Sequence, residues 1–196
     1  TSVMLRLAIE NHIKRELNLA PRKIKVLSLF FINKVADYRL HDNDATTDGW
    51  LAKLFIEQLK IVLQSSHGKR YLELCHNSFN LNLDSDLDLA KLHNGYFAKD
   101  KKGNYKDSKD DTQDSVAAYQ LIMKDKELLL DQQTPLRFIF SHSALKEGWD
   151  NPNVFQVCVL QESSNTFKRR QQVGRGLRLC VNNFGERIKD DKINTL

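Results

Sequence analysis

Three apolar runs, separated by long stretches of helical periodicity, constrain the fold of this chain more than any other feature. The runs cover residues 25–32, 138–140 and 154–160, and hydrophobic residues follow one another in them almost without interruption. Such continuity is typical of strands that are buried on both faces, whereas a strand with one wet face alternates apolar and polar residues. Strands that alternate with helices predict a parallel sheet with right-handed crossovers. The expected fold class is therefore α/β.

Helical spacing of apolar residues predicts three helices in the same chain. The first covers residues 3–17, with Ser2 as its N-cap; the second begins at Asp48 and Gly49 and ends at Leu63; the third covers residues 112–130. A further strand is expected at residues 71–75. Residues 77–115 are rich in Asn, Asp, Lys and Gly, and we interpret them as a polar insertion with a surface hairpin around residues 102–104. Residues 1–196 are expected to form one domain that carries this insertion.

Composition argues against several classes of protein. No apolar stretch approaches the roughly 20 residues that span a bilayer, so we expect a soluble protein without a membrane partner. The three cysteines are odd in number and form no C-x-x-C pair, which favours reduced thiols in the cytoplasm. The chain starts without Met or a signal sequence, and we interpret it as part of a longer polypeptide.

Basic charge is concentrated near the end of the chain. Residues 166–178 contain five basic residues and no acidic one, although the net charge of the whole chain is only +5. At helical spacing the polar residues of this run share one face, which consists of Lys168, Gln171, Gly174, Arg175 and Arg178. A glycine inside a helix costs about 1 kcal/mol relative to alanine, so Gly174 indicates a close approach to the backbone there. Rigid guanidinium groups suit the spread negative charge of a phosphoryl group, and a solvated basic helix is the alternative.

Three segments together resemble a known family. Residues 171–178 have the pattern Q-x-x-G-R-x-x-R, which is similar to motif VI of superfamily 2 helicases. Residues 143–150, which end in Gly148-Trp149-Asp150, resemble motif V, and residues 27–39 resemble the motif IV region. In this combination the chain resembles the helicase-like motor (Res) subunit of type III restriction enzymes. The resemblance implies a second RecA-like lobe, a three-layer fold of the P-loop NTPase type with a central, mostly parallel sheet.

The resemblance implies a role for each residue that matches a motif. Arg175 and Arg178 would be arginine fingers that reach the γ-phosphate of ATP, and Gln171 would position water or phosphate. The nucleotide-binding set adds Gly148, Asp150 and Gly174. The nucleic-acid backbone would be held by polar residues at two strand ends, namely Asn33, Lys34, Ser141, His142 and Ser143. The alternatives are a solvated surface helix, a simple turn at Asp150, and side chains that cap the next helix.

The resemblance also implies cofactors and partners. ATP and Mg²⁺ would be bound mainly by a first RecA-like lobe of the same polypeptide, because neither a Walker A nor a Walker B pattern is present, and this chain alone is expected to be inactive. Double-stranded DNA and a modification methyltransferase subunit are the other expected partners, and no metal-ligand pattern is complete. Two alternatives remain open: the motor lobe of another superfamily 2 helicase, of type I restriction or repair, and a non-catalytic module that binds nucleic acid or docks a subunit.

Overall fold

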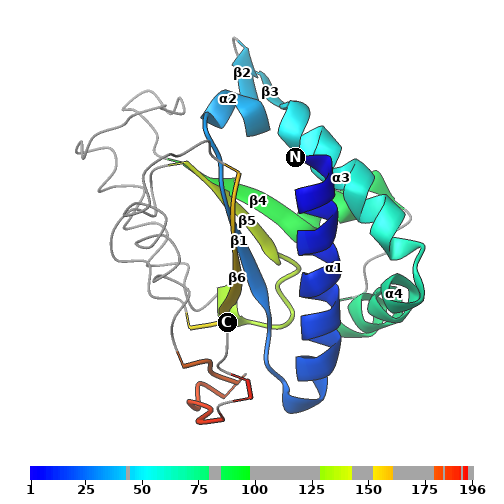
Figure 1. Ribbon diagram of the computed structural model, residues 1–196, viewed down its shortest axis with the longest axis vertical. Helices are drawn as coiled ribbons and strands as arrows, with labels where there is room; N and C mark the ends of the chain where they lie inside the picture. The colour runs from blue at the N-terminus through cyan, green and yellow to red at the C-terminus, as the bar shows by residue number, and fades with distance from the viewer. Residues whose placement is uncertain are drawn as a thin grey trace, which may run out of the picture.

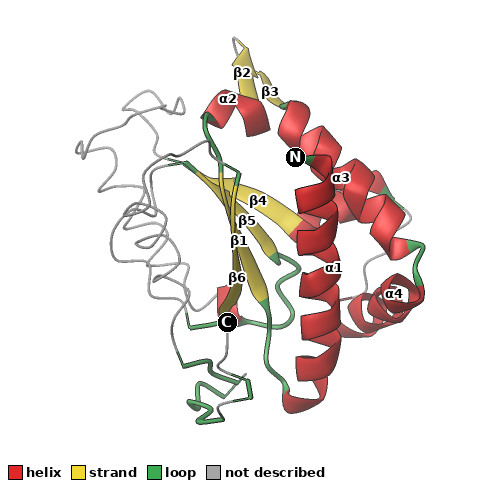
Figure 2. Cartoon of the chain, viewed as in Figure 1, coloured by secondary structure: helices red, strands yellow, loops and turns green. Residues whose placement is uncertain are grey.

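The centre of the molecule is a parallel sheet. The computed structural model describes residues 1–42, 45–79, 85–97, 129–142, 152–160, 179–182, 184–190 and 192–193 (Figure 2). Its four-stranded sheet has the order β4-β5-β1-β6, formed by β4 (His93–Tyr96), β5 (Phe138–Ser141), β1 (Leu27–Phe31) and β6 (Val154–Val159). All neighbouring strands in it are parallel. The three apolar runs of the sequence are β1, β5 and β6, so the predicted α/β class is confirmed.

Long helices cover one face of this sheet (Figure 1). They are α1 (Ser2–Leu19), α3 (Trp50–Leu63) and α4 (Ser66–Phe79), and α1 packs against both of the others. The shorter elements are η1 (Ala20–Arg22), α2 (Val35–Tyr38), the antiparallel hairpin of β2 (Arg39–Asp42) and β3 (Ala45–Asp48), α5 (Asp86–Leu89) and η2 (Ala90–Leu92). Every helix that the structure describes is too short or too polar to cross a membrane.

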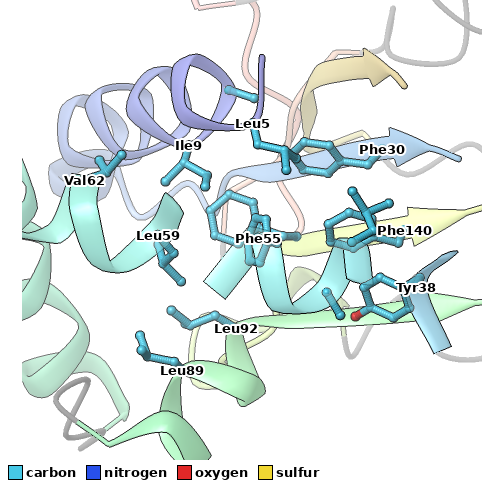
Figure 3. Packing of buried hydrophobic residues seen from close by; sticks show 14 of the residues in the cluster. Leu5, Ile9, Phe30, Tyr38, Phe55, Leu59, Val62, Leu89, Leu92 and Phe140 are labelled. Carbon is cyan, nitrogen blue, oxygen red and sulfur yellow. The ribbon is translucent and has the colours of Figure 1, made fainter. Parts of the chain in front are cut away.

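Apolar side chains fill both sides of the sheet. Because side chains alternate along a strand, Phe30 and Phe140 point toward the helices, while Leu29 and Ile139 belong to a separate cluster on the opposite face. On the helix side the rings of Phe30 and Phe140 stack with centroids 4.8 Å apart, and Phe55 of α3 packs against them (Figure 3). All five side chains are fully buried. Burial on both faces explains why hydrophobicity along the strands is continuous.

Residues 71–75 belong to a helix, and the predicted strand is wrong. In α4 the buried positions are Gly68, Tyr71 and Cys75, which is the spacing of three and four residues that defines one face of a helix. Glu73 between them is exposed. A window of five residues is too short to separate a buried strand from one turn of an amphipathic helix.

Other boundaries also differ from the expectations. Thr1 and not Ser2 is the N-cap of α1, and no side chain makes a capping hydrogen bond there. Within the predicted insertion at residues 77–115, β4 is a strand of the central sheet, and Leu89 and Leu92 are fully buried, so residues 85–97 pack as part of the α/β domain. The hairpin expected around residues 102–104 lies outside the described residues. So does the helix expected at residues 112–130, apart from residues 129 and 130, which are helical.

A buried polar network joins α1 to the amino ends of the strands. Glu16 accepts hydrogen bonds from Arg137 Nε at 2.6 Å and from the Tyr71 hydroxyl at 3.0 Å. His12 Nε2 lies 3.0 Å from the same carboxylate, and its Nδ1 lies 2.8 Å from Ser28 Oγ. Burial alone would raise the pKa of Glu16, but the charge of Arg137 and the hydrogen bond to His12 lower it to about 2. Burial lowers the pKa of His12, so a neutral imidazole donates from Nε2 to an ionised carboxylate.

Candidate functional site

The carboxyl ends of β1 and β5 lie side by side and bring two predicted polar pairs to one edge of the sheet. The backbone amide of Ile32 donates a hydrogen bond of 2.9 Å to the carbonyl of Ser141, so the two strands end level with each other. Asn33 and Lys34 follow β1 after one residue, Ile32, and His142 follows β5 directly. Loops at this edge are where ligands of open α/β sheets gather. The fold therefore assembles a candidate site from residues more than a hundred positions apart in the sequence.

These residues differ in how much solvent they meet. Asn33 and Lys34 are exposed, His142 is partly buried, and Ser141 has an exposed fraction of 0%. The Ser141 side chain is two positions from Ile139 along β5, on the face of the sheet turned away from α1, and its hydroxyl has no hydrogen-bond partner in the described part of the chain. A hydroxyl buried to this degree cannot touch a phosphate in solvent. Among the described members of the predicted set, Asn33 and Lys34 are the exposed residues that can.

The short helix α2 holds Lys34 at the edge. Lys34 is its N-cap residue in an extended conformation, and Val35 and Tyr38 anchor the helix in the core. The Tyr38 hydroxyl lies 2.6 Å from His93 Nδ1 at the start of β4. Burial lowers the pKa of His93 to about 4, so the ring is neutral near pH 7 and its Nδ1 accepts the hydroxyl proton. The hydrogen bond from Tyr38 to His93 therefore ties α2, which follows the loop after β1, to strand β4.

A tryptophan that belongs to none of the sequence motifs lies beside this loop. Trp50 is the first residue of α3, and 54% of it is exposed. Its indole Nε1 donates a hydrogen bond of 2.9 Å to Asp37 Oδ1 of α2. Gly49 makes this arrangement possible, because a Cβ there would lie 2.3 Å from the backbone carbonyl oxygen of Asp37. The sequence signal was a Gly-Trp pair at a helix start, but only the tertiary contacts show that the indole stays in solvent.

The residues expected to meet the nucleotide lie outside the described residues. They are Gly148, Asp150, Gln171, Gly174, Arg175 and Arg178, and the same holds for Ser143. After this part of the sequence the chain is held at the amino edge of the sheet by the side chain of Asn153. Its Oδ1 accepts a hydrogen bond from the Val181 backbone N–H at 2.9 Å, and its Nδ2 donates one to the Val181 carbonyl at 3.0 Å. Within the described ranges, no group of His, Cys, Asp and Glu side chains could hold a metal ion.

Fold and site together define the class of the domain. A parallel four-stranded sheet, long helices on one face and polar loops collected at the carboxyl edge make up an α/β domain of the RecA-like type. The order and direction of the strands agree with the fold that the sequence motifs implied.

Comparison with curated proteins finds three relatives of one kind. The chain is 42% identical over 192 residues to the Res subunit of the type III restriction-modification enzyme EcoPI from Escherichia phage P1. It is 39% identical over 196 residues to the EcoP15I Res subunit from Escherichia coli, and both comparisons cover 95% of this chain and 18% of the relative. The StyLTI Res subunit from Salmonella typhimurium is 35% identical over 188 residues, which is 89% of this chain and 18% of that protein.

Along nearly its whole length the chain is therefore similar to a segment of the Res subunits of type III restriction-modification enzymes, and it spans 18% of the length of these relatives. No family model matches the chain. No solved structure matches it significantly.

Proposed function

We propose that the chain is the second motor lobe of an ATP-dependent DNA translocase or helicase in a type III restriction endonuclease. Kinship with Res subunits along nearly the whole chain supports this role. The structural observation that carries it is the carboxyl edge, where the loop after β1 presents Asn33 and Lys34 to solvent beside the end of β5. Ligands of open α/β sheets bind at such an edge.

Contacts from this edge to DNA would be made to the backbone. The Lys34 ammonium group would pair with a phosphate, and the Asn33 amide would donate a hydrogen bond to a phosphate or sugar oxygen. Contacts of this kind read no base sequence, which suits a motor that must move over any sequence. Ser141, His142 and Ser143 complete the proposed set. The buried Ser141 would reach a phosphate only after neighbouring residues moved away from it.

The part of the proposal that concerns ATP rests on the sequence. Arg175 and Arg178 would act as arginine fingers on ATP that is held, with Mg²⁺, mainly by a first RecA-like lobe of the same polypeptide, and Gln171 would orient water or phosphate. Gly148, Asp150 and Gly174 would contact the nucleotide. Double-stranded DNA and a modification methyltransferase subunit are the other proposed partners, in the cytoplasm.

Arg175→Ala in the complete protein tests the role in ATP hydrolysis. Loss of an arginine finger should lower the rate of DNA-stimulated ATP hydrolysis by about 10³- to 10⁵-fold. Arg187→Ala is the matched control, because Arg187 is an exposed arginine whose described partner is a backbone bridge to Val181 at the amino edge. Its rate should stay at the wild-type value. Wild-type turnover in Arg175→Ala would contradict the assignment.

Lys34→Ala tests the DNA contact at the carboxyl edge. Removing one phosphate contact should weaken binding to DNA of any sequence, and the slope of log K against log salt should become shallower by about 1. Lys69→Ala is the control, because Lys69 is an exposed lysine on α4, away from this edge. Equal salt slopes in the two variants would remove Lys34 from the proposed contact set.

A further inference from the structure

We propose that Trp50 is a stacking platform for an unpaired base of a nucleic-acid strand that lies across the carboxyl edge. This inference rests on the proposed function for the location of the strand, and it adds a contact that no motif assigns. Trp50 exposes 54% of its surface, whereas the next two residues of α3, Leu51 and Ala52, expose 2% and 0%. The helix thus begins with its largest side chain outside the core.

The indole already has a hydrogen-bond partner that favours one orientation before any ligand arrives. Its only polar group, Nε1–H, donates to Asp37 Oδ1 at 2.9 Å, which ties the ring to α2. The backbone under the ring is fixed as well, because the Gly49 amide donates to the Tyr38 carbonyl at 2.8 Å. A ring that is already held in place loses little side-chain entropy when a ligand stacks on it, so this arrangement favours binding.

Close packing of two helix ends puts the ring beside the loop after β1. A Cβ at Gly49 would lie 2.3 Å from the carbonyl oxygen of Asp37 and 2.7 Å from that of Ala36, so only glycine lets the start of α3 approach α2 this closely. Lys34 is the N-cap of α2, one turn before Asp37. Figure 1 shows α2, the β2–β3 hairpin and the first turn of α3 together beyond the end of β1.

The charges around the ring fit a phosphate backbone. Lys34 and Lys53 are exposed, and Lys53 lies one turn after Trp50 on α3. Of the nearby acidic groups, Asp37 is engaged by the indole, and Asp48 lies opposite Arg39 in the hairpin register. Exposed aromatic side chains on the same elements as exposed cations are a combination with which proteins hold single strands, since every base has a flat face and every nucleotide has a phosphate.

The chemistry of stacking specifies the kind of strand. In a duplex both faces of each base are covered by its neighbours, so an indole can stack only on a base that is unpaired or splayed out. The edge should therefore prefer single-stranded segments or duplex ends over an intact duplex. Stacking is tolerant of base identity, because it uses no hydrogen-bond pattern.

Photocrosslinking of the complete protein tests the contact directly. A single-stranded oligonucleotide that contains 5-iododeoxyuridine is irradiated in the complex, and the attached peptide is identified by mass spectrometry. Crosslinking at position 50 is expected for the wild type and for Trp50→Phe, which keeps an aromatic ring. It should be lost in Trp50→Leu. Crosslinking requires no catalytic turnover, and the wild-type result is informative even if a variant folds poorly.

Binding measurements separate stacking from charge. Trp50→Leu should bind the same oligonucleotide about 5- to 100-fold more weakly, with an unchanged salt slope, because no phosphate contact is lost. Phe184→Leu is the control: Phe184 is 70% exposed next to Lys23 at the opposite edge of the sheet, and its loss should leave binding unchanged.

Three outcomes decide the matter. Crosslinking at Trp50 with weaker binding by Trp50→Leu supports the platform. Absence of that crosslink, with wild-type binding by Trp50→Leu but weaker binding by Lys34→Ala, overturns the platform and leaves the proposed function in place. If neither variant changes binding to nucleic acid and Arg175→Ala hydrolyses ATP at the wild-type rate, the proposed function fails and the platform fails with it.

Discussion

Glu16→Gln should strongly destabilise the fold, because it removes the carboxylate charge that pairs with a buried arginine. Arg137 is 2% exposed and donates from Nε to Glu16 Oε1 at 2.6 Å. Three further N–H groups of Arg137 donate to the neutral backbone carbonyls of Thr134, Leu136 and Gln132. A glutamine has nearly the same shape as glutamate but no charge, so the substitution isolates the electrostatic contribution.

The magnitude follows from the pKa of Glu16. Folding lowers that pKa from an ordinary value of 4.5 to about 2, despite burial that opposes ionisation. At 1.36 kcal/mol per unit, the ionised form contributes about 3 kcal/mol to stability above pH 5. Breaking one partner of a buried ion pair typically costs about 3–5 kcal/mol, which agrees. The backbone acceptors of Arg137 place the expected loss near the lower end of that range.

The assay is urea unfolding of the 196-residue chain at several pH values. Because the folded-state pKa of Glu16 is depressed, its contribution is complete above the unfolded pKa and is lost as pH falls from about 4.5 to about 2. The wild type should lose stability across this window, and Glu16→Gln should start lower and change less. Glu57→Gln, at an exposed position of α3, is the control and should stay within about 0.5 kcal/mol of the wild type. A loss below about 1 kcal/mol in Glu16→Gln at pH 7 would refute the reasoning.

Three further substitutions test other parts of the fold. Burial, with the nearby charge of Arg137, lowers the pKa of Lys25 from 10.5 to about 6, so the folded state releases a proton that the unfolded state keeps. The stability of the wild type should therefore rise with pH between 6 and 10.5. Lys25→Met should flatten this rise, which urea unfolding midpoints at pH 7 and pH 9 would measure. Gly49→Ala should lower the unfolding free energy by about 1–3 kcal/mol, because the added methyl group meets backbone; an unchanged midpoint would contradict the close approach of α2 and α3. Asn153→Ala should lower the free energy of unfolding by about 1–3 kcal/mol and speed hydrogen exchange at the Val181 amide. Unchanged protection of that amide would contradict the two hydrogen bonds between Asn153 and Val181.

The sheet was accessible to sequence reasoning because its signal is local. Continuous apolar runs identified β1, β5 and β6, and the periodicity from Leu51 to Val62 identified α3 with its start at Gly49. β4 was missed because His93–Tyr96 is a short edge strand with the polar sequence His-Asn-Gly-Tyr. Its place in the sheet comes from hydrogen bonding to β5, which no local pattern predicts.

The candidate site was only partly accessible. Motif resemblance pointed to both polar pairs, and parallel strand order explains why their loops meet at one edge. It could not distinguish the exposed Lys34 from the fully buried Ser141, because both residues follow an apolar run and both are polar. Trp50 carried no motif, and its hydrogen bond to Asp37 spans 13 residues.

By itself, the amino-acid sequence determined that this chain forms a parallel α/β domain and that its polar loops share one edge. Those properties follow from hydrophobic periodicity, which is set by neighbours along the chain. Only the tertiary structure decided that Asn33, Lys34 and Trp50 face solvent while Ser141 does not, and that Glu16 holds an ionised arginine in the core. Exposure and charge pairing depend on which distant segments pack against a side chain, and that information becomes available only when the chain has folded.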